Sequence, residues 1–191
     1  MKVIAFNGSA RKDGNTAILI NYVLKELEKE GIETELYQLS GKKIHGCIAC
    51  RKCAENLDQR CAVKDDVLNN CIEKMLEADG IILGSPTYVG DVSSQMKALI
   101  DRAGFVSKMN GCMFKRKIGA GVVAARRGGL LPTFYSLNNL FFLGQMIIPC
   151  SKYWNICFGR EKGEVEQDEE GIQTMKILGE NMAWLLKKIH G

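Results

Sequence analysis

Short apolar runs alternate along the chain with longer segments in which apolar residues recur every three or four positions. The short runs predict buried strands, over residues 2–7, 33–39, 80–84, 117–124 and 147–150. The longer segments predict amphipathic helices, over residues 16–29, 65–78, 93–103, 133–144 and a last segment after residue 171. Strands that alternate with helices favour right-handed crossovers between parallel strands. The expected fold class is therefore α/β, with a doubly wound sheet of five parallel strands.

The loop after the first strand is a candidate anion site. In open parallel sheets, ligands bind beyond the carboxyl ends of the strands, where the strand order reverses. This loop leads directly into a helix, whose first N–H groups are unpaired, and it offers donors from Ser9, Asn15 and Thr16. Arg11 adds positive charge. The loop matches neither the Walker A motif nor G-x-G-x-x-G, which disfavours ATP and a Rossmann-bound dinucleotide. The alternative is that Asn15 or Thr16 only caps the helix.

The loops after the third and fourth strands carry residues suited to a flat ring. Residues 84–93 contain Pro86, Tyr88 and several hydroxyl groups, and residues 124–129 contain two arginines followed by two glycines. A flavin needs this combination, because its ring is apolar on its faces and forms hydrogen bonds along its rim. An ordinary turn capped by Ser93, or a solvated basic turn, would contain the same residues. The three loops are therefore more informative together than any one alone.

Residues 40–64 lack clear periodicity, and a loop of that length in a compact domain is usually functional. The loop contains Cys47, Cys50, Cys53 and Cys61 at the spacing C-x2-C-x2-C-x7-C. Two-residue spacings allow successive thiolates to reach separate irons of one cuboidal cluster, and a fourth cysteine on a longer loop can complete the site. The pattern predicts a [4Fe–4S] cluster. Zinc, which usually takes two separated C-x2-C pairs, and unligated redox thiols are the alternatives.

The composition limits the class of protein. The chain has 191 residues, of which 46% are hydrophobic and 25% charged, and this suits a single globular domain over residues 1–191. The formal net charge of +4 comes from scattered lysines and arginines and gives no reason to expect nucleic-acid binding. No apolar run reaches the roughly 18 residues that span a membrane, and no signal peptide is evident. A cytoplasmic location is expected.

Eight cysteines in a reducing compartment favour metal ligation or thiol chemistry over disulfides. The four outside the loop are dispersed among apolar residues and are expected to be small structural residues, namely Cys71, Cys112, Cys150 and Cys157. His45 lies close to the motif but is expected on the surface. Asp65 and Asp66 are expected to face the positive end of the helix predicted over residues 65–78.

Three motifs together resemble the NAD(P)H-dependent FMN reductases of the flavodoxin-like superfamily. They are Gly8-Ser9-Ala10-Arg11 with Gly14-Asn15-Thr16, Gly84-Ser85-Pro86-Thr87-Tyr88-Val89-Gly90, and Ser94-Gln95-Met96-Lys97-Ala98-Leu99-Ile100-Asp101-Arg102. The Arg126-Arg127-Gly128-Gly129 segment fits as well, so the resemblance covers nearly the whole chain. The cysteine motif is similar to that of the iron–sulfur flavoproteins, a branch of the same superfamily. Its last spacing is at the long end for that branch.

The resemblance implies a flavodoxin-like fold, with residues 40–64 as an inserted [4Fe–4S]-binding loop, and FMN rather than FAD as the flavin. It implies that the FMN phosphate is held by Ser9, Arg11, Asn15 and Thr16. It implies that the isoalloxazine ring is lined by Pro86, Thr87, Tyr88, Val89 and Gly90, and by Ala125, Arg126, Arg127, Gly128 and Gly129.

These cofactors indicate an electron-transfer flavoprotein, because FMN exchanges one or two electrons and the cluster exchanges one. The expected donor is ferredoxin or a similar carrier. The resemblance suggests oxygen or hydrogen peroxide as the small acceptor, and a homodimer or homotetramer as the assembly. No residue is an obvious acid, base or nucleophile, so no catalytic side chain is predicted. The alternatives are an NAD(P)H-dependent reductase of free flavin or quinone, and a non-enzymatic module stapled by zinc.

Overall fold

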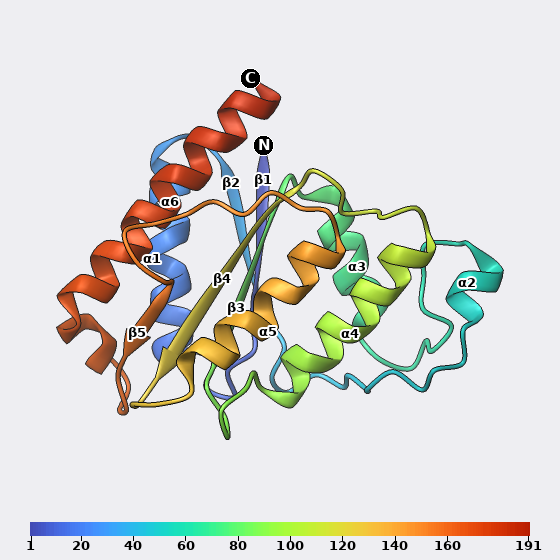
Figure 1. The fold of residues 1–191 in the computed structure, drawn as a ribbon, viewed down its shortest axis with the longest axis horizontal. Helices are drawn as coiled ribbons and strands as arrows, with labels where there is room; N and C mark the ends of the chain where they lie inside the picture. The colour runs from blue at the N-terminus through green and yellow to red at the C-terminus, as the bar shows by residue number, and fades with distance from the viewer.

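Five parallel strands form one sheet in the computed structural model, which describes residues 1–191. The strand order is β2-β1-β3-β4-β5 (Figure 1). The strands are β1 (Lys2–Asn7), β2 (Glu33–Gln38), β3 (Gly80–Pro86), β4 (Ile118–Ala125) and β5 (Ile156–Phe158). This order is the flavodoxin-like one, with the reversal between β1 and β3. The predicted α/β fold class is confirmed.

Helices cover both faces of the sheet (Figure 1). They are α1 (Asn15–Lys29), α2 (Lys52–Asn56), α3 (Leu68–Glu77), α4 (Ser94–Met109), α5 (Leu130–Leu143) and α6 (Glu169–His190), with a 3-10 turn at Glu164–Gln167. The core accordingly has two layers. One lies between the sheet and α1 with α6, and the other lies between the sheet and α3, α4 and α5. No helix is long and apolar enough to cross a membrane.

The last strand lies later in the chain than the sequence indicates. The predicted strand over residues 147–150 is wrong, because Ile147 forms only an isolated bridge with Ile118 and Pro149 lacks the N–H that a ladder needs. The chain then crosses to β5, whose three residues pair with Val123, Ala124 and Ala125. Three residues are too few to give a periodic signal, so β5 was not predictable from its pattern.

Several helices differ from their predicted bounds, and α4 continues to Met109, beyond the predicted end at residue 103. Helix α5 begins at Leu130, so Pro132 lies in its first turn, where a missing N–H breaks no helical hydrogen bond. Helix α3 begins at Leu68, and Asp65 and Asp66 therefore lie before it. Asp66 accepts a hydrogen bond of 3.1 Å from the Leu68 amide, but its carboxylate is mainly occupied by an ion pair with Arg102.

Candidate functional site: a strand-end cleft and a cysteine pocket

A cleft of about 200 Å³, here called the strand-end cleft, lies at the carboxyl ends of the strands. The loops after β1, β3 and β4 line it, as the fold rule predicts. The segment after β5 contributes as well. The sequence did not predict this part of the cleft, because it placed the last strand at residues 147–150. The lining residues are Ser9, Arg11, Asn15, Thr16, Pro86, Thr87, Tyr88, Ala124, Ala125, Arg126, Gly159 and Arg160.

The start of α1 lies at this cleft, and no side chain caps its first backbone amides. The N-cap is Gly14, and the first helical hydrogen bond runs from the Ile18 amide to the Gly14 carbonyl at 3.1 Å. The interpretation of Asn15 or Thr16 as a mere cap is therefore wrong. The amides of the first turn and the positive end of the helix dipole suit a phosphate group.

Asn15 joins the first loop to the segment after β5. Its side-chain amide donates to the Glu161 carbonyl at 2.9 Å, and its side-chain oxygen accepts from the Gly163 amide at 2.8 Å. Both ends of the side chain are thus engaged by the protein, which makes Asn15 a residue that closes the cleft. The Ser9 hydroxyl accepts from the Arg11 amide at 3.1 Å and shapes the turn between them.

The ring side of the cleft is formed by two loops in close contact. The Thr87 amide donates to the Ala124 carbonyl at 2.9 Å. Gly129 has φ +80°, and a Cβ at this position would come within 2.9 Å of the Gly90 Cα, so only glycine allows the two loops to approach this closely. Val89 is fully exposed at the tip of its loop.

Most of the predicted flavin residues lie at the strand-end cleft. Of the predicted set, the residues that do not line it are Val89, Gly90, Arg127, Gly128 and Gly129, which lie at the outer ends of the same two loops.

All four motif cysteines line a second site, here called the cysteine pocket. They share it with apolar residues and with three residues of α4. The full lining is Cys47, Ile48, Cys50, Arg51, Cys53, Cys61, Ala62, Val63, Arg102, Phe105 and Val106. No group of three or more His, Cys, Asp or Glu side chains converges on the position of a single metal ion. The sulfurs surround a pocket rather than one point.

The backbone turns sharply between the cysteines. Ala49 has φ +53° and Arg51 has φ +57°, both in the left-handed region that non-glycine residues rarely adopt. Leu57 and Gln59 repeat this conformation before Cys61. Such conformations cost free energy and are typical of functional sites. Here they place three closely spaced cysteines on one pocket.

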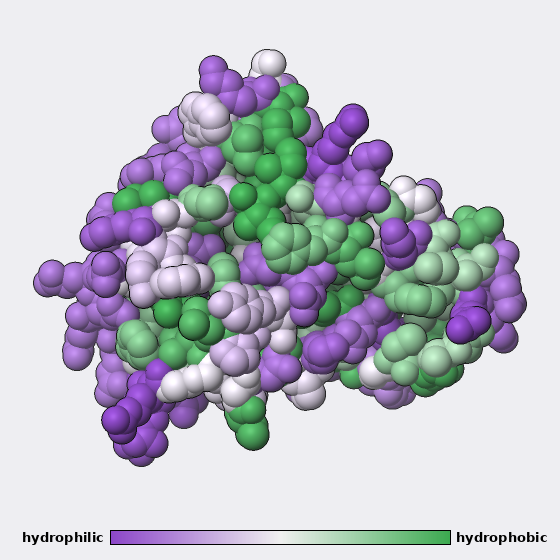
Figure 2. Space-filling model, in the orientation of Figure 1, coloured by the Kyte–Doolittle hydropathy of each residue, from purple (hydrophilic) through white to green (hydrophobic).

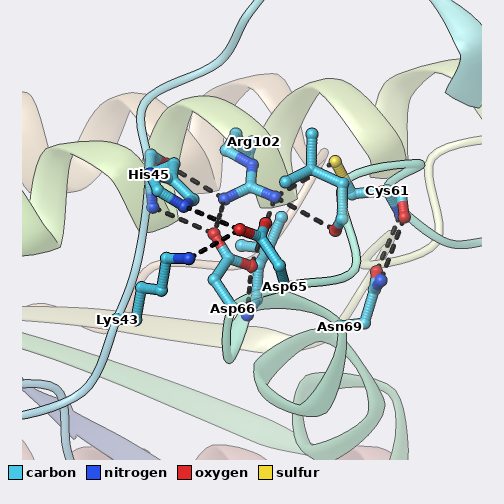
Figure 3. Close-up of polar contacts among 9 residues, drawn as sticks. Lys43, His45, Cys61, Asp65, Asp66, Asn69 and Arg102 are labelled. Carbon is cyan, nitrogen blue, oxygen red and sulfur yellow. Dashed lines mark hydrogen bonds and ion pairs between the residues drawn. The ribbon is translucent and has the colours of Figure 1, made fainter.

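Two side chains fix Cys61, the cysteine on the longest spacing (Figure 3). The side-chain oxygen of Asn69 accepts from the Cys61 amide at 2.7 Å, and its NH2 group donates to the Cys61 carbonyl at 2.9 Å. Arg102 of α4 donates to the Cys61 Sγ at 3.2 Å. The cysteine spacing predicts neither partner, because Asn69 lies 8 residues and Arg102 41 residues beyond Cys61, both outside the motif.

One buried ion pair, between Arg102 and Asp66, lies beside this pocket. Burial alone raises the pKa of Asp66, but hydrogen bonds from Arg102 and from the His45 and Leu68 amides outweigh it, so the pKa is held below its usual range. Burial and the neighbouring Cys61 raise the pKa of the Cys53 thiol. The thiol therefore favours its protonated form until an electrophilic metal binds it.

The comparison with known proteins identifies the chain. The family described as NADPH-dependent FMN reductase matches residues 1–160. An iron–sulfur flavoprotein of Methanocaldococcus jannaschii is 38% identical and aligns over 99% of both chains. The chain belongs to the iron–sulfur flavoproteins. A second relative, the iron–sulfur flavoprotein of Methanosarcina thermophila, is 31% identical over 99% of this chain and 97% of its own.

Solved structures support the flavodoxin-like fold of this iron–sulfur flavoprotein. A WrbA-like flavodoxin from Agrobacterium tumefaciens has a TM-score of 0.66 and 16% identity, with 98% of this chain and 97% of that chain covered. A flavodoxin from the domain Archaea has a TM-score of 0.63 and 16% identity, with 98% and 99% covered. At these identities the likeness concerns the fold alone.

Membership in this family settles the coarse biochemistry. The protein is a flavin-dependent oxidoreductase and a flavin electron-transfer protein, as the sequence predicts. The family also supports FMN and an iron–sulfur cluster as its cofactors. The side chains present fit such a cluster, because four cysteines line one pocket and thiolates are the usual ligands of iron–sulfur centres.

The remaining cysteines divide into two kinds. Cys71 and Cys157 are buried, as expected, and burial raises the pKa of Cys71 to about 12. Cys112 is half-buried and Cys150 is exposed, so the prediction of a buried structural role is wrong for Cys150. Cys150 lies in the irregular segment that leads to β5, and the apolar neighbours in the sequence do not enclose it.

Proposed function

We propose that this flavoprotein takes single electrons from ferredoxin or a similar donor through a [4Fe–4S] cluster and transfers them by way of FMN to a small acceptor, with oxygen and hydrogen peroxide as candidates. The observation that carries the proposal is that Cys47, Cys50, Cys53 and Cys61 line one pocket. When bound, the two cofactors supply the chemistry, since FMN exchanges one or two electrons and the cluster one.

The loop is proposed as the module that adds this cluster to the fold. Residues 1–191 would form one domain, with residues 40–64 as a cluster-binding insertion between β2 and α3. The four cysteines are the proposed ligands, and their thiols would be kept reduced in the cytoplasm. Phe105 and Val106 provide an apolar wall for the pocket, which limits the access of water to the cluster.

The strand-end cleft is the proposed FMN site. The first-turn amides of α1, with Ser9, Arg11 and Thr16, would bind the phosphate, while Asn15 holds the segment after β5 against it. The residues proposed for the isoalloxazine ring are those of the two loops beyond β3 and β4, namely Pro86, Thr87, Tyr88, Val89, Gly90, Ala125, Arg126, Arg127 and Gly128. Arg126, Arg127 and those backbone amides of the two loops that are not already paired would supply hydrogen bonds to the ring rim.

A homodimer or homotetramer is part of the proposal. The cysteine pocket and the strand-end cleft share no lining residue. Apolar side chains lie exposed around a groove of about 750 Å³ beside α5, among them Tyr135, Phe142, Tyr153 and Trp154. Figure 2 shows apolar atoms gathered in this area, where the chain crosses from α5 to β5. Burial of such a surface favours association, and association would bring the cluster of one subunit toward the FMN of another.

Analysis of anaerobically purified protein tests the cofactors. About four irons, four sulfides and one FMN per chain are expected. Zinc, or no metal, with FMN present would contradict the cluster and leave a plain flavoprotein. Sedimentation of the same sample gives the assembly, and a monomer would contradict the oligomer.

Stopped-flow reduction tests the donor. Reduced ferredoxin should bleach the FMN faster than NADPH does, and oxygen or hydrogen peroxide should reoxidise it. Fast bleaching by NADPH with no response to ferredoxin would instead identify an NAD(P)H-dependent reductase of flavin or quinone.

A further inference from the structure

Arg102 is an arginine enclosed in the interior, in the middle of α4. Its side chain is 1% exposed, and the side chain of its partner Asp66 is fully buried. Arginine is almost never buried to this degree unless its charge is paired. The ion pair with Asp66 satisfies that requirement, but it uses only part of the guanidinium (Figure 3).

The remaining donors of Arg102 reach three other points of the cysteine loop. One nitrogen donates to the His45 carbonyl at 3.0 Å. The other donates to the Cys61 Sγ at 3.2 Å and to the Val63 carbonyl at 3.5 Å. One side chain thus ties the two ends of the cysteine motif to α4. The contact with the Cys61 sulfur differs from the contacts with the two carbonyl groups, because those two are enough to attach the loop to the helix.

We infer that Arg102 is a positioning residue for the cluster, which holds Cys61 as the fourth ligand and raises the reduction potential of the iron–sulfur centre. The inference rests on the proposed function, since it concerns the proposed cluster. A neutral thiol is a weak acceptor, whereas a thiolate accepts a charge-assisted hydrogen bond from guanidinium. A hydrogen bond to a ligand sulfur stabilises the reduced, more negative cluster and so raises its potential.

Asp66 has the opposite effect in this arrangement. Its carboxylate neutralises Arg102, fixes the guanidinium plane and accepts a hydrogen bond from the same nitrogen that donates to the Cys61 sulfur. The intact pair therefore gives the cluster a reduction potential between the values expected after removal of either partner. Removal of Arg102 leaves a negative charge near the cluster, and removal of the Asp66 charge leaves an uncompensated positive one. A purely structural pair would give the same defect from either side.

A redox titration of the loaded protein, followed by electron paramagnetic resonance, separates these cases. Arg102→Gln should shift the cluster midpoint potential downward, and Asp66→Asn should shift it upward. Lys108→Gln removes one positive charge from an exposed position on the same helix and should leave the potential unchanged. Equal potentials in wild type, R102Q and D66N would overturn the inference, as would shifts of the same sign in both variants.

Arg102→Lys keeps the charge in the pocket and guards against loss of the fold. It should retain iron and FMN with a smaller downward shift than R102Q, because an ammonium cannot bind Asp66 and Cys61 in the same fork. Loss of iron from all three variants, with FMN retained, would refute control of the reduction potential. The ion pair would then serve only to attach the cysteine loop to α4. Wild-type protein without an iron–sulfur signal would instead refute the proposed function.

Discussion

The strand-end cleft and the cysteine pocket obtain their shapes in different ways. The cleft is a consequence of the fold, because any sheet of this order gathers the loops after β1, β3 and β4 at one edge. The cysteine pocket lies in a segment with little regular structure, and single side chains such as Asn69 and Arg102 hold it in place. A binding site that the fold provides should tolerate change better than one that a few side chains maintain.

The largest expected effect is on the cysteine pocket. Cys50→Ala should lose the broad iron–sulfur absorbance and nearly all of the roughly four irons, because one of four ligands is removed. FMN content should be unchanged, since the strand-end cleft contains no motif cysteine. The matched control is Cys150→Ala, which changes an exposed cysteine outside the pocket and should keep both cofactors. Full iron and sulfide in C50A would show that Cys50 is not a ligand.

A negative charge placed in the strand-end cleft should impair FMN binding and spare the iron–sulfur cluster. Thr16→Asp should weaken FMN binding about a hundredfold or more, because contact between like charges costs several kcal/mol and each 1.4 kcal/mol is about tenfold in affinity. Iron content should be retained. Fluorescence titration of FMN measures the affinity. Ser94→Asp adds the same charge to the first turn of α4, outside the cleft, and should have no effect. Unchanged affinity in T16D would place the phosphate elsewhere.

Loss of the link between the two chain segments should have an intermediate effect. Asn15→Ala removes two hydrogen bonds, to Glu161 and Gly163, each worth about 0.5–1.5 kcal/mol. FMN affinity should fall about tenfold, and thermal unfolding should show a modest loss of stability. Asn181→Ala removes one hydrogen bond, to the Cys150 carbonyl, and serves as the control. If N15A and N181A bind FMN equally well, the segment after β5 takes no part in the site.

The smallest change is a difference in thiol reactivity. In cofactor-free protein, alkylation should reach the exposed Cys47, Cys50 and Cys150 first and leave Cys71 unmodified until unfolding. Burial raises the pKa of Cys71 to about 12, so its thiolate stays scarce as the pH rises from 7 to 9. Mass spectrometry of peptides gives the order. Cluster loading should protect Cys47 and Cys50, and rapid labelling of Cys71 in folded protein would contradict its burial.

The same buried thiol affects stability at high pH. The pKa of Cys71 is higher in the folded protein, about 12, than the ordinary value of 9.0. Its contribution to the free energy of unfolding is therefore fully present below pH 9 and declines between about pH 9 and pH 12, where the unfolded chain releases the proton first. Cys71→Ala should flatten this decline in urea unfolding measured at several pH values. An identical slope in both proteins would rule out this contribution.

The part of the molecule set by periodicity was predictable, and the part set by single contacts was not. The first four strands and the three loops beyond them follow from apolar runs and the rule for parallel sheets. The spacing of the cysteines predicted which residues line the pocket. Strand β5 was not predicted, because three residues are too few to show a repeating pattern of apolar and polar positions. Gly159 and Arg160 were missed with it. Arg102 appeared in the sequence only as one member of a helical motif, because its contacts lie 36 to 57 residues away.

The bonds from Asn15 to Glu161 and Gly163 also bear on synthesis of the chain. They join positions 146 and 148 residues apart, so the cleft is complete only when most of the polypeptide has left the ribosome. The lining of the cysteine pocket and the hydrogen bonds of Cys53 and Cys61 lie within residues 47–110. During translation the pocket for the metal cluster can therefore form while the flavin site still lacks its last wall.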